Sequence, residues 1–424
     1  MTEFYQVCHI FLILEKTLFC HFLVKYLMNN TRRTLLSLLL IFGSIIHCQS
    51  QTSDQPLYQR AEQLAQKFII LDGHIDTPYR VKISKENVAK HTSKGDFDYY
   101  RAKKGGLNAP FMSIFIPAFF QNKNGRAKFF ANALIRTVEE LAERNPQRFA
   151  MARTPRDIEK HFRKGLISLP MGMENGAPIE GRLENLSFFY KRGIRYISLT
   201  HGKDNHICDS STDPRKTWGG LSPFGKKVVK EMNHLGMMVD VSHVSDEAFY
   251  QVIKLSKAPV IASHSSCRKF TPGFARNMTD DMIKALAKNG GVIQINFGAM
   301  FLNESSGNAY VKMTQIRSNL KLSPQKREAA AKAYIKQHPL KADISEVVKH
   351  IDHVVQIAGI NHVGLGSDFD GVGDALPEGL KDVSFYPNLI YHLLKKGYSE
   401  RAIEKICAGN VLRVWKAVEK QAGK

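Results

Sequence analysis

Cysteine is scarce in this sequence of 424 residues, which contains six cysteines. Three of them lie within the first 50 residues, so Cys208, Cys267 and Cys407 remain if that segment is removed. Three thiols cannot all pair within one chain, which excludes a fold held together by a disulfide framework. Cys267 follows His264 by three residues, but we interpret it as a partly buried free thiol and not as a metal ligand.

Acidic residues are also few, since 39 Asp and Glu stand against 60 Lys and Arg, for a net charge of +21. Such a charge could attract nucleic acid or an anionic envelope surface. The sequence lacks, however, any stripe of Lys and Arg interleaved with aromatic residues, and residues 321–341 spread their charge over faces that we expect to be solvated. Because no other nucleic-acid recognition motif is present, we expect no nucleic-acid partner.

Strongly apolar sequence without charge is confined to the N-terminal region. Residues 28–50 carry two arginines, then an apolar core over residues 35–46, then small residues before Gln51. This order is typical of a secretory signal peptide, and the core is too short to span a bilayer comfortably. Because residues 1–27 hold a second, less regular apolar stretch, Met28 could be the true start.

We therefore predict that residues 1–50 are a targeting segment and that residues 55–420 form the functional domain. The protein would be exported to the periplasm or secreted. Lipid attachment at Cys48 is an alternative that would tether it to a membrane, but His47 is a poor residue to precede a lipidated cysteine. Residues 416–424 contain no hydrophobic tail, which argues against a glycolipid anchor.

Eight short apolar runs, most of them separated by stretches with helical spacing, occupy the rest of the chain. Apolar runs of this length that alternate with helices are typical of parallel strands buried on both faces. Eight such units predict an α/β fold, a closed (β/α)8 TIM barrel whose chemistry lies at the C-terminal ends of the strands. The predicted strands are Phe68–Asp76, Ala109–Pro117, Gly165–Asn175, Ile194–His201, Gly236–His243, Pro259–His264, Gly291–Phe297 and His362–Asp370.

Several of these strands end in residue types that bind metal ions. His74 and Asp76 are two positions apart, so they point to the same face of the first strand. Glu174 ends the third strand, and His243 and His264 each follow a serine at the ends of the fifth and sixth. A lone histidine at such a place is more often a hydrogen-bonded core residue, and Glu174 alone could be a salt-bridged strand end. Together, three imidazoles and two carboxylates exceed the needs of one tetrahedral zinc with an open position, which indicates a binuclear site.

The predicted arrangement divides these ligands between two metal ions. We expect His74 and Asp76 on the first ion, His243 and His264 on the second, and Glu174 between them. Nitrogen and oxygen ligands without thiolate favour two Zn²⁺ ions, with Mn²⁺ or Co²⁺ as substitutes. Two such ions can hold a hydroxide at neutral pH and polarise the group that it attacks.

The last strand offers a carboxylate that could carry a proton. Asp368 and Asp370 lie in the sequence Gly-Ser-Asp-Phe-Asp-Gly, and we prefer Asp368 because Phe369 and Asp370 would begin the loop. A carboxylate facing the metal site can take a proton and pass it to a leaving amine. The structural alternative is that the two aspartates only cap a glycine-rich turn. His201, which ends the fourth predicted strand, could equally be a core residue or a site residue.

The chain resembles the membrane dipeptidase family (renal dipeptidase-like, peptidase family M19) of the amidohydrolase superfamily. The matching segments are LDGHID, GMEN, LTH, GLSPFGKKVVKEMNHLGMMVDVSHVS, APVIASHSS, RNMTDD, GLGSDFDGV and NVLRV, in order through most of residues 65–415. The resemblance implies a zinc-dependent (β/α)8 hydrolase that cleaves dipeptides, including dipeptides with a C-terminal D-residue, through attack of a hydroxide that bridges the metals.

The resemblance also implies a role for individual residues. It assigns metal binding to the same five residues and the acid/base role to Asp368. It adds that His201 stabilises the substrate carbonyl oxygen as it becomes negative, and that Arg276 binds the substrate's terminal carboxylate in a bidentate pair. Animal members carry a cysteine just after the fourth-strand histidine, where this chain has Lys203. Their disulfide pattern and their exact specificity are therefore not carried over.

Two alternative functions stay open at this point. The same scaffold could act on N-acyl amino acids, lactones or other small amides. The chain could also be a non-catalytic envelope-binding protein that kept the barrel, although the intact ligand set argues against this. We expect a dipeptide substrate as the partner, and a homodimer is an open alternative to a monomer.

Overall fold

The computed structural model describes residues 54–121 and 125–423. The predicted targeting segment, with Cys48 and Met28, lies outside the described residues. The chain divides into the units Met1–Leu57 and Tyr58–Lys424, and the second unit contains the barrel. None of the helices within the described ranges has the length and apolarity that crossing a membrane requires.

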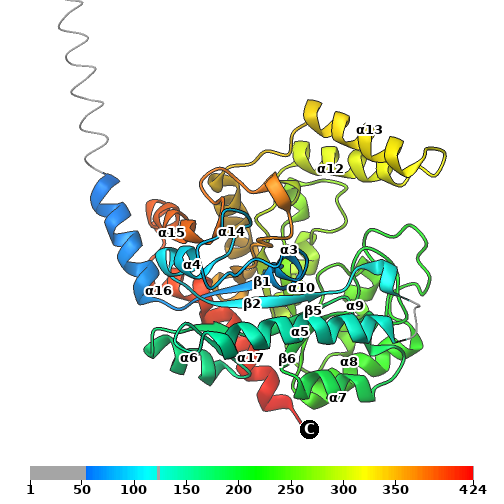
Figure 1. Cartoon of the computed structure of the whole chain (residues 1–424), viewed down its shortest axis with the longest axis horizontal. Helices are drawn as coiled ribbons and strands as arrows, with labels where there is room; N and C mark the ends of the chain where they lie inside the picture. Colours follow the sequence, from blue (N-terminus) through cyan, green and yellow to red (C-terminus); the bar gives the residue numbers. More distant parts are fainter. Residues whose placement is uncertain (1–53, 122–124, 424) are drawn as a thin grey trace, which may run out of the picture. The chain divides into compact units, whose positions relative to one another are not determined.

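Eight parallel strands close into a barrel in the order β1-β10-β9-β8-β7-β6-β5-β2. Each of the eight predicted runs overlaps one of these strands, so the predicted TIM barrel is confirmed. Nearly all strand residues are buried on both faces, because helices cover the outside of the barrel (Figure 1). The barrel strands are β1 Ile70–Ile75, β2 Leu107–Phe115, β5 Met171–Glu174, β6 Ile194–Ser198, β7 Met238–Asp240, β8 Ile261–Ser265, β9 Val292–Ile295 and β10 Val363–Leu365.

The third predicted run, Gly165–Asn175, forms two strands and not one. Ile167–Leu169 (β4) pairs with Phe149–Met151 (β3) in a separate two-stranded sheet, whereas Met171–Glu174 (β5) is the barrel strand. Pro170 separates the two strands because it has no N–H to donate to a ladder. The apolar composition is continuous across this proline, so the prediction of one long strand was wrong.

Capping residues set the ends of the helices. The Ser222 side chain accepts a hydrogen bond from the Gly225 N–H at 2.8 Å and starts α8 (Pro223–Leu235), with Pro223 in the first turn. Gly236 ends this helix with a left-handed φ of 75°. Thr279 caps α10 in the same way as Ser222 caps α8. These two helices lead into β7 and β9, and Gly236 separates α8 from β7.

Helices precede, connect and follow the strands. The long connection between β9 and α14 carries α11, α12 and α13, and α12 and α13 form a projection in Figure 1. A helix over residues 54–67 precedes β1. The other helices are α3 Thr77–Ser84, α4 Tyr99–Gly105, α5 Arg126–Arg144, α6 Pro155–Arg163, α7 Glu184–Lys191, α8 Pro223–Leu235, α9 Asp246–Leu255, α10 Asp280–Lys288, α11 Ala299–Leu302, α12 Glu304–Arg317, α13 Pro324–Gln337, α14 Ile344–Ala358, α15 Tyr386–Lys395, α16 Glu400–Glu404 and α17 Asn410–Gln421.

A buried cluster joins α17 to the barrel. The Trp415 ring of α17 lies 5.3 Å from the ring of Phe111, which lies 5.1 Å from the ring of Tyr196. Other members of this cluster, such as Leu71 and Met238, lie in the first halves of their strands. The cluster therefore fills the end of the barrel opposite to the C-terminal strand ends, and Tyr196 extends from it toward the site.

Candidate metal centre

The five predicted metal ligands lie in or directly after barrel strands. His74 belongs to β1, and Asp76 follows that strand by one residue. Glu174 is the last residue of β5, and His264 belongs to β8. His243 lies three residues after β7, with a left-handed φ of 72°. The C-terminal ends of four strands therefore carry these residues to one place, as predicted.

Three residues that we predicted to lie within strands are in loops. His201, His243 and Asp368 each follow the last residue of their strand by three positions. The positive φ values of His243 (72°) and Asp368 (64°) are incompatible with extended backbone, so β7 and β10 cannot continue through these two residues. The apolar pattern did not reveal this, because a left-handed residue leaves no signature in hydrophobicity.

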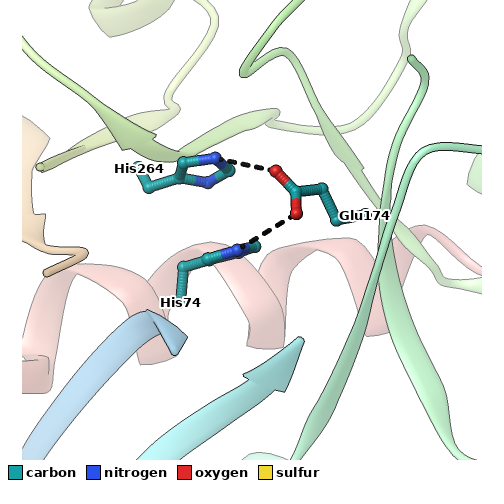
Figure 2. A group of neighbouring side chains, drawn as sticks. All are labelled: His74, Glu174 and His264. Atoms are coloured by element: carbon teal, nitrogen blue, oxygen red, sulfur yellow. Dashed lines mark ion pairs between the residues drawn. The ribbon is translucent and has the colours of Figure 1, made fainter. Parts of the chain in front are cut away.

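Glu174 lies at the centre of the cluster. Its Oε1 atom is 2.9 Å from Nε2 of His243 and 3.2 Å from Nε2 of His264. Nε2 of His201 lies 3.6 Å from Oε1, and Nε2 of His74 lies 3.6 Å from the other oxygen, Oε2. Figure 2 shows His74 and His264 presenting ring nitrogens to different oxygens of this carboxylate. The two oxygens thus face different imidazoles, which is the geometry that a bridging carboxylate requires.

The potential ligand atoms form three overlapping groups. Within each group, one atom of every residue lies within 4.8 Å of the others. The groups are His74, Glu174 and His264; Glu174, His201 and His243; and His74, Asp76 and Asp368. The first two groups share Glu174, and the third contains the carboxylates of Asp76 and Asp368, which follow β1 and β10. The structure therefore brings His201 and Asp368 together with all five predicted ligands.

The buried polar atoms of this cluster fit a cation. Among the described residues, Nε2 of His74 and Oδ1 of Asp76 are buried without any hydrogen-bond partner. An unsatisfied buried polar group costs about 1–3 kcal/mol, so such atoms need a ligand. Nε2 of His74 also lies 3.6 Å from Oδ2 of Asp76. A metal ion between imidazole and carboxylate would satisfy both orphaned atoms, and the donor set is one that metals of the zinc type accept.

A hydrogen bond behind His74 directs its lone pair toward the cluster. The Tyr196 hydroxyl donates to the carbonyl of Gly73 at 2.9 Å and lies 2.9 Å from Nδ1 of His74. Because the single hydroxyl hydrogen is already used, the hydroxyl accepts from the N–H at Nδ1. In the neutral ring, Nε2 of His74 is then the unprotonated nitrogen, as metal binding requires. Spacing had not suggested Tyr196, although it is a polar residue on an otherwise apolar strand.

The protonation states of the cluster suit metal binding. Burial and then the nearby Arg276 cation hold the pKa of His243 well below its usual value. Burial and then the neighbouring His74 do the same to the pKa of His264. Burial opposes ionisation of Glu174, but His201 and the other imidazoles hold its pKa well below its usual value. Neutral His243 and His264 beside an ionised Glu174 are in the form that binds metal ions. Burial opposes protonation of His74, but Tyr196 and the carboxylates of Glu174 and Asp76 raise its pKa well above its usual value, so a metal ion at Nε2 would displace a proton there.

Asp368 has the environment of a group that holds a proton. Burial, followed by the negative charge of Asp76, raises the pKa of Asp368 well above its usual value. Its Oδ2 atom accepts a hydrogen bond of 2.9 Å from the amide of Asn296, directly after β9. A Cβ atom at Gly371 would lie 2.3 Å from a carboxylate oxygen of Asp368 and 2.3 Å from one of Asp76, so only glycine fits there. Sequence reasoning had missed Asn296, although it is a polar residue at a strand end.

Arg276 is a buried cation beside the cluster. Its guanidinium donates to the Ser265 hydroxyl and to the His264 carbonyl, each at 2.8 Å. Its Nε is buried and has no hydrogen-bond partner in the described part of the chain. Burial lowers the pKa of Arg276 to about 10, so the side chain is charged at neutral pH. Spacing alone had not distinguished Arg276 from a surface cation, and its burial is the observation that does so.

The three described cysteines take no part in this cluster. Cys208, Cys267 and Cys407 are free and buried, so the expectation of no disulfide framework holds for them. The Cys267 thiol faces the carbonyl of His350 at 3.7 Å. It is more deeply buried than expected, but it is a free thiol as predicted.

Known proteins resemble this chain over most of its length. The family description "Membrane dipeptidase (Peptidase family M19)" matches residues 58–424. An uncharacterized dipeptidase of Schizosaccharomyces pombe is 32% identical over 376 residues, which cover 85% of this chain and 83% of the relative.

Solved structures agree with this assignment. The probable dipeptidase PvdM from Pseudomonas aeruginosa has a TM-score of 0.78 at 29% identity and covers 87% of this chain and 100% of its own. A metallo peptidase from Rhodobacter sphaeroides, liganded with a phosphinate mimic of the dipeptide L-Ala-D-Ala, has a TM-score of 0.69 at 25% identity. It covers 83% of this chain and 99% of its own.

The family match extends through the barrel and every residue of the cluster around Glu174. The family match, the relative and the solved structures together identify the reaction as hydrolysis of a peptide bond by a metallo-dipeptidase. The resemblance expected from the motifs is thereby confirmed, and the chain belongs to the membrane dipeptidase family, peptidase family M19.

Proposed function

We propose that this metallo-dipeptidase holds two Zn²⁺ ions and cleaves dipeptides, including dipeptides with a D-residue at the C-terminal position. The position of Glu174 carries the proposal, because its two oxygens face different imidazoles. The Rhodobacter sphaeroides relative, which was crystallised with a mimic of L-Ala-D-Ala, supports the substrate class.

The ligand set that we propose follows the strand ends. His74 and Asp76 would hold one ion, His243 and His264 the other, and Glu174 would bridge them. When bound, the ions supply Lewis acidity, which makes a nucleophile from water at neutral pH and polarises a carbonyl. Mn²⁺ or Co²⁺ could replace zinc at sites of this composition.

Arg276 would bind and orient the substrate through its terminal carboxylate. The guanidinium is charged, fixed by two hydrogen bonds of 2.8 Å and still has an unpaired Nε. A charged donor buried in this state favours an anion of matching geometry. A free C-terminal carboxylate provides such an anion, which is why the site would select dipeptides over internal peptide bonds.

His201 and Asp368 would act on the charge and the proton of the reaction. The His201 side chain is 29% exposed and lies 3.6 Å from Glu174, so it lines the site without being enclosed. Burial lowers the pKa of His201, and a neutral imidazole N–H can donate to the carbonyl oxygen as that oxygen becomes negative. Asp368, which Asn296 orients, would carry a proton to the departing amine.

Purified protein tests this proposal directly. We expect two zinc equivalents per chain by elemental analysis, hydrolysis of L-Ala-L-Ala and L-Ala-D-Ala, loss of activity with a chelator, and recovery with zinc. One metal per chain, or activity that survives complete demetallation, would contradict the binuclear proposal. N-acetyl-alanine and a lactone belong in the same panel, since a higher kcat/KM for either would favour that substrate class.

Export and assembly are also proposals. Sequence features of residues 28–50 support export to the periplasm or secretion, and lipid attachment at Cys48 is the alternative. Mass spectrometry of the mature N-terminus would separate cleavage before Gln51 from a lipidated cysteine. Light scattering of the purified protein would determine whether it is a homodimer.

A further inference from the structure

Asp240 ends β7 and is completely buried next to the candidate metal centre. Its Oδ1 atom accepts hydrogen bonds from the backbone N–H groups of Ser242 at 3.0 Å and Ser263 at 2.8 Å. Its Oδ2 atom accepts from the Ser263 hydroxyl at 2.6 Å and from the Ser198 hydroxyl. One carboxylate therefore connects β7, β8 and β6 at the level of the site.

The Ser263 hydroxyl connects this carboxylate to an imidazole. Its Oγ atom lies 2.7 Å from Nδ1 of His264. Because the only hydroxyl hydrogen is donated to Asp240, Oγ accepts the N–H of Nδ1. A neutral imidazole has one N–H, so Nε2 of His264 keeps its lone pair, and this atom lies 3.2 Å from Oε1 of Glu174.

We propose that Asp240 is a positioning residue that acts through Ser263 to fix the tautomer of His264 and so sets the metal affinity of the centre. This inference rests on the proposed role of His264 as a metal ligand. Histidine ligands generally donate their second N–H to a carboxylate, a carbonyl or water. In this chain a serine hydroxyl lies between the two groups, so Asp240 orients the imidazole without touching it.

Asp72 in β1 provides an internal comparison. Its Oδ1 atom also accepts two backbone N–H groups, those of His74 and Ser367, each at 3.0 Å. Its Oδ2 atom accepts from the Tyr386 hydroxyl, whereas Nδ1 of His74 bonds to Tyr196 instead. Asp72 thus braces two strand ends like Asp240, but its hydrogen bonds do not lead to an imidazole.

The variant Asp240→Asn should reverse the direction of the serine hydrogen bond. The amide oxygen must take the Oδ1 position, because two N–H groups point at it. The NH₂ group then faces Ser263 and donates to its Oγ atom. The hydroxyl hydrogen would turn to Nδ1 of His264, which places the imidazole proton on Nε2, where a metal must bind. We expect zinc affinity to fall about 10- to 100-fold, the usual effect of losing such a partner.

Matched variants separate the effect of this relay, the hydrogen-bonded chain Asp240–Ser263–His264, from a general loss of stability. Ser263→Ala removes the relay but leaves the backbone bonds of Asp240, and it should also weaken zinc binding. Ser198→Ala removes the other hydroxyl from the same oxygen, and Asp72→Asn repeats the Asp-to-Asn change where no imidazole is connected. Both should bind zinc within about threefold of wild type, since neither removes a hydrogen bond between Asp240, Ser263 and His264.

The experiment measures zinc affinity by competition with a chromophoric chelator, together with the Tm of the metal-free protein. For Asp240→Asn and Ser263→Ala we expect zinc activation curves shifted to higher zinc, with kcat largely recovered at saturation and KM for L-Ala-L-Ala unchanged. Loss of zinc affinity as large in Ser198→Ala as in Asp240→Asn, or wild-type affinity in both relay variants, would overturn the proposal. If Asp240→Asn does not fold, Ser263→Ala alone decides.

The variant His264→Ala distinguishes the two levels of the argument. If it keeps wild-type zinc affinity, the proposed ligand set is wrong and the relay has no target. If it loses zinc while the relay variants do not, the ligand set stands and only the role of Asp240 is refuted.

Discussion

Replacing Asp368 by Asn should abolish most turnover while leaving the metal centre intact. The two side chains have nearly the same shape, and an amide oxygen can still accept the hydrogen bond from Asn296. The replacement removes only the ability to take up and release a proton. Asp368 is not one of the five proposed ligands, so its loss should leave the metal content unchanged.

The expected magnitude follows from the role assigned to this carboxyl group. General acid–base catalysis contributes about 10²–10⁴ in rate, which corresponds to roughly 2.7–5.5 kcal/mol of barrier. Burial and Asp76 raise the pKa of Asp368 well above its usual value, so the group has a substantial affinity for the proton it would transfer. We therefore expect kcat to fall about 10²–10⁴-fold with KM changed much less.

Asp370 provides the control, since it is the second carboxylate of the same turn. Its side chain pairs with Arg80 at 3.1 Å and accepts from the Thr77 hydroxyl at 2.6 Å, so it belongs to a different set of contacts. Asp370→Asn should lower stability but leave kcat within a few-fold of wild type. Steady-state kinetics on L-Ala-L-Ala, with zinc content measured on the same samples, test both variants. An active Asp368→Asn enzyme, or equal losses in the two variants, would refute the assignment.

Four further predictions concern binding and stability. Arg276→Lys should raise KM about tenfold to a hundredfold, because it removes one charge-assisted hydrogen bond to the substrate carboxylate, which contributes about 1.5–3 kcal/mol to binding. Steady-state kinetics test this. Chelation should lower Tm by several degrees and zinc should restore it, since a ligand at 100 times its Kd adds about 2.7 kcal/mol to the free energy of unfolding. Calorimetry measures this shift, and no shift would mean that the protein holds no metal. Burial and then the charge of Asp370 raise the pKa of Asp96 from 3.8 to about 7. The contribution of Asp96 to stability is therefore lost as pH rises from about 4 to 7, and the unfolding free energy of Asp96→Asn, measured with denaturant, should depend less on pH over that range. At the left-handed position 368, Asp368→Gly should be more stable than Asp368→Ala by about 1 kcal/mol in chemical denaturation.

Periodicity and strand-end chemistry were sufficient to predict the barrel and the cluster of side chains around Glu174. Parallel strands must be apolar on both faces, so Gly236–His243 or Gly291–Phe297 can be recognised from composition alone. A polar residue behind such a run is conspicuous because it would be costly to bury unpaired, and this identified Glu174 and His264. The fold rule that strand ends meet then placed these residues together.

The remaining features depend on contacts between segments distant in sequence. Pro170 divides one apolar run into strands of two sheets, and only the pairing with Phe149–Met151 reveals it. The burial of Arg276 and the contact of Tyr196 with His74 arise from packing across the barrel. Such contacts have no local signature, so neither residue stood out from its neighbours in the sequence.

The two left-handed residues of the site show how the fold holds a strained backbone. His243 and Asp368 adopt positive φ, which is unfavourable by about 1–2 kcal/mol for most residues other than glycine, and by less for aspartate. Each follows a serine whose backbone N–H is bonded to a buried aspartate, Asp240 or Asp72. The bond holds the chain immediately before the strained residue, at the point where the strand ends. Asp240 and Asp72 therefore fix the directions in which His243 and Asp368 project. Because both aspartates lie in barrel strands, these hydrogen bonds hold the site residues in a fixed position relative to the barrel.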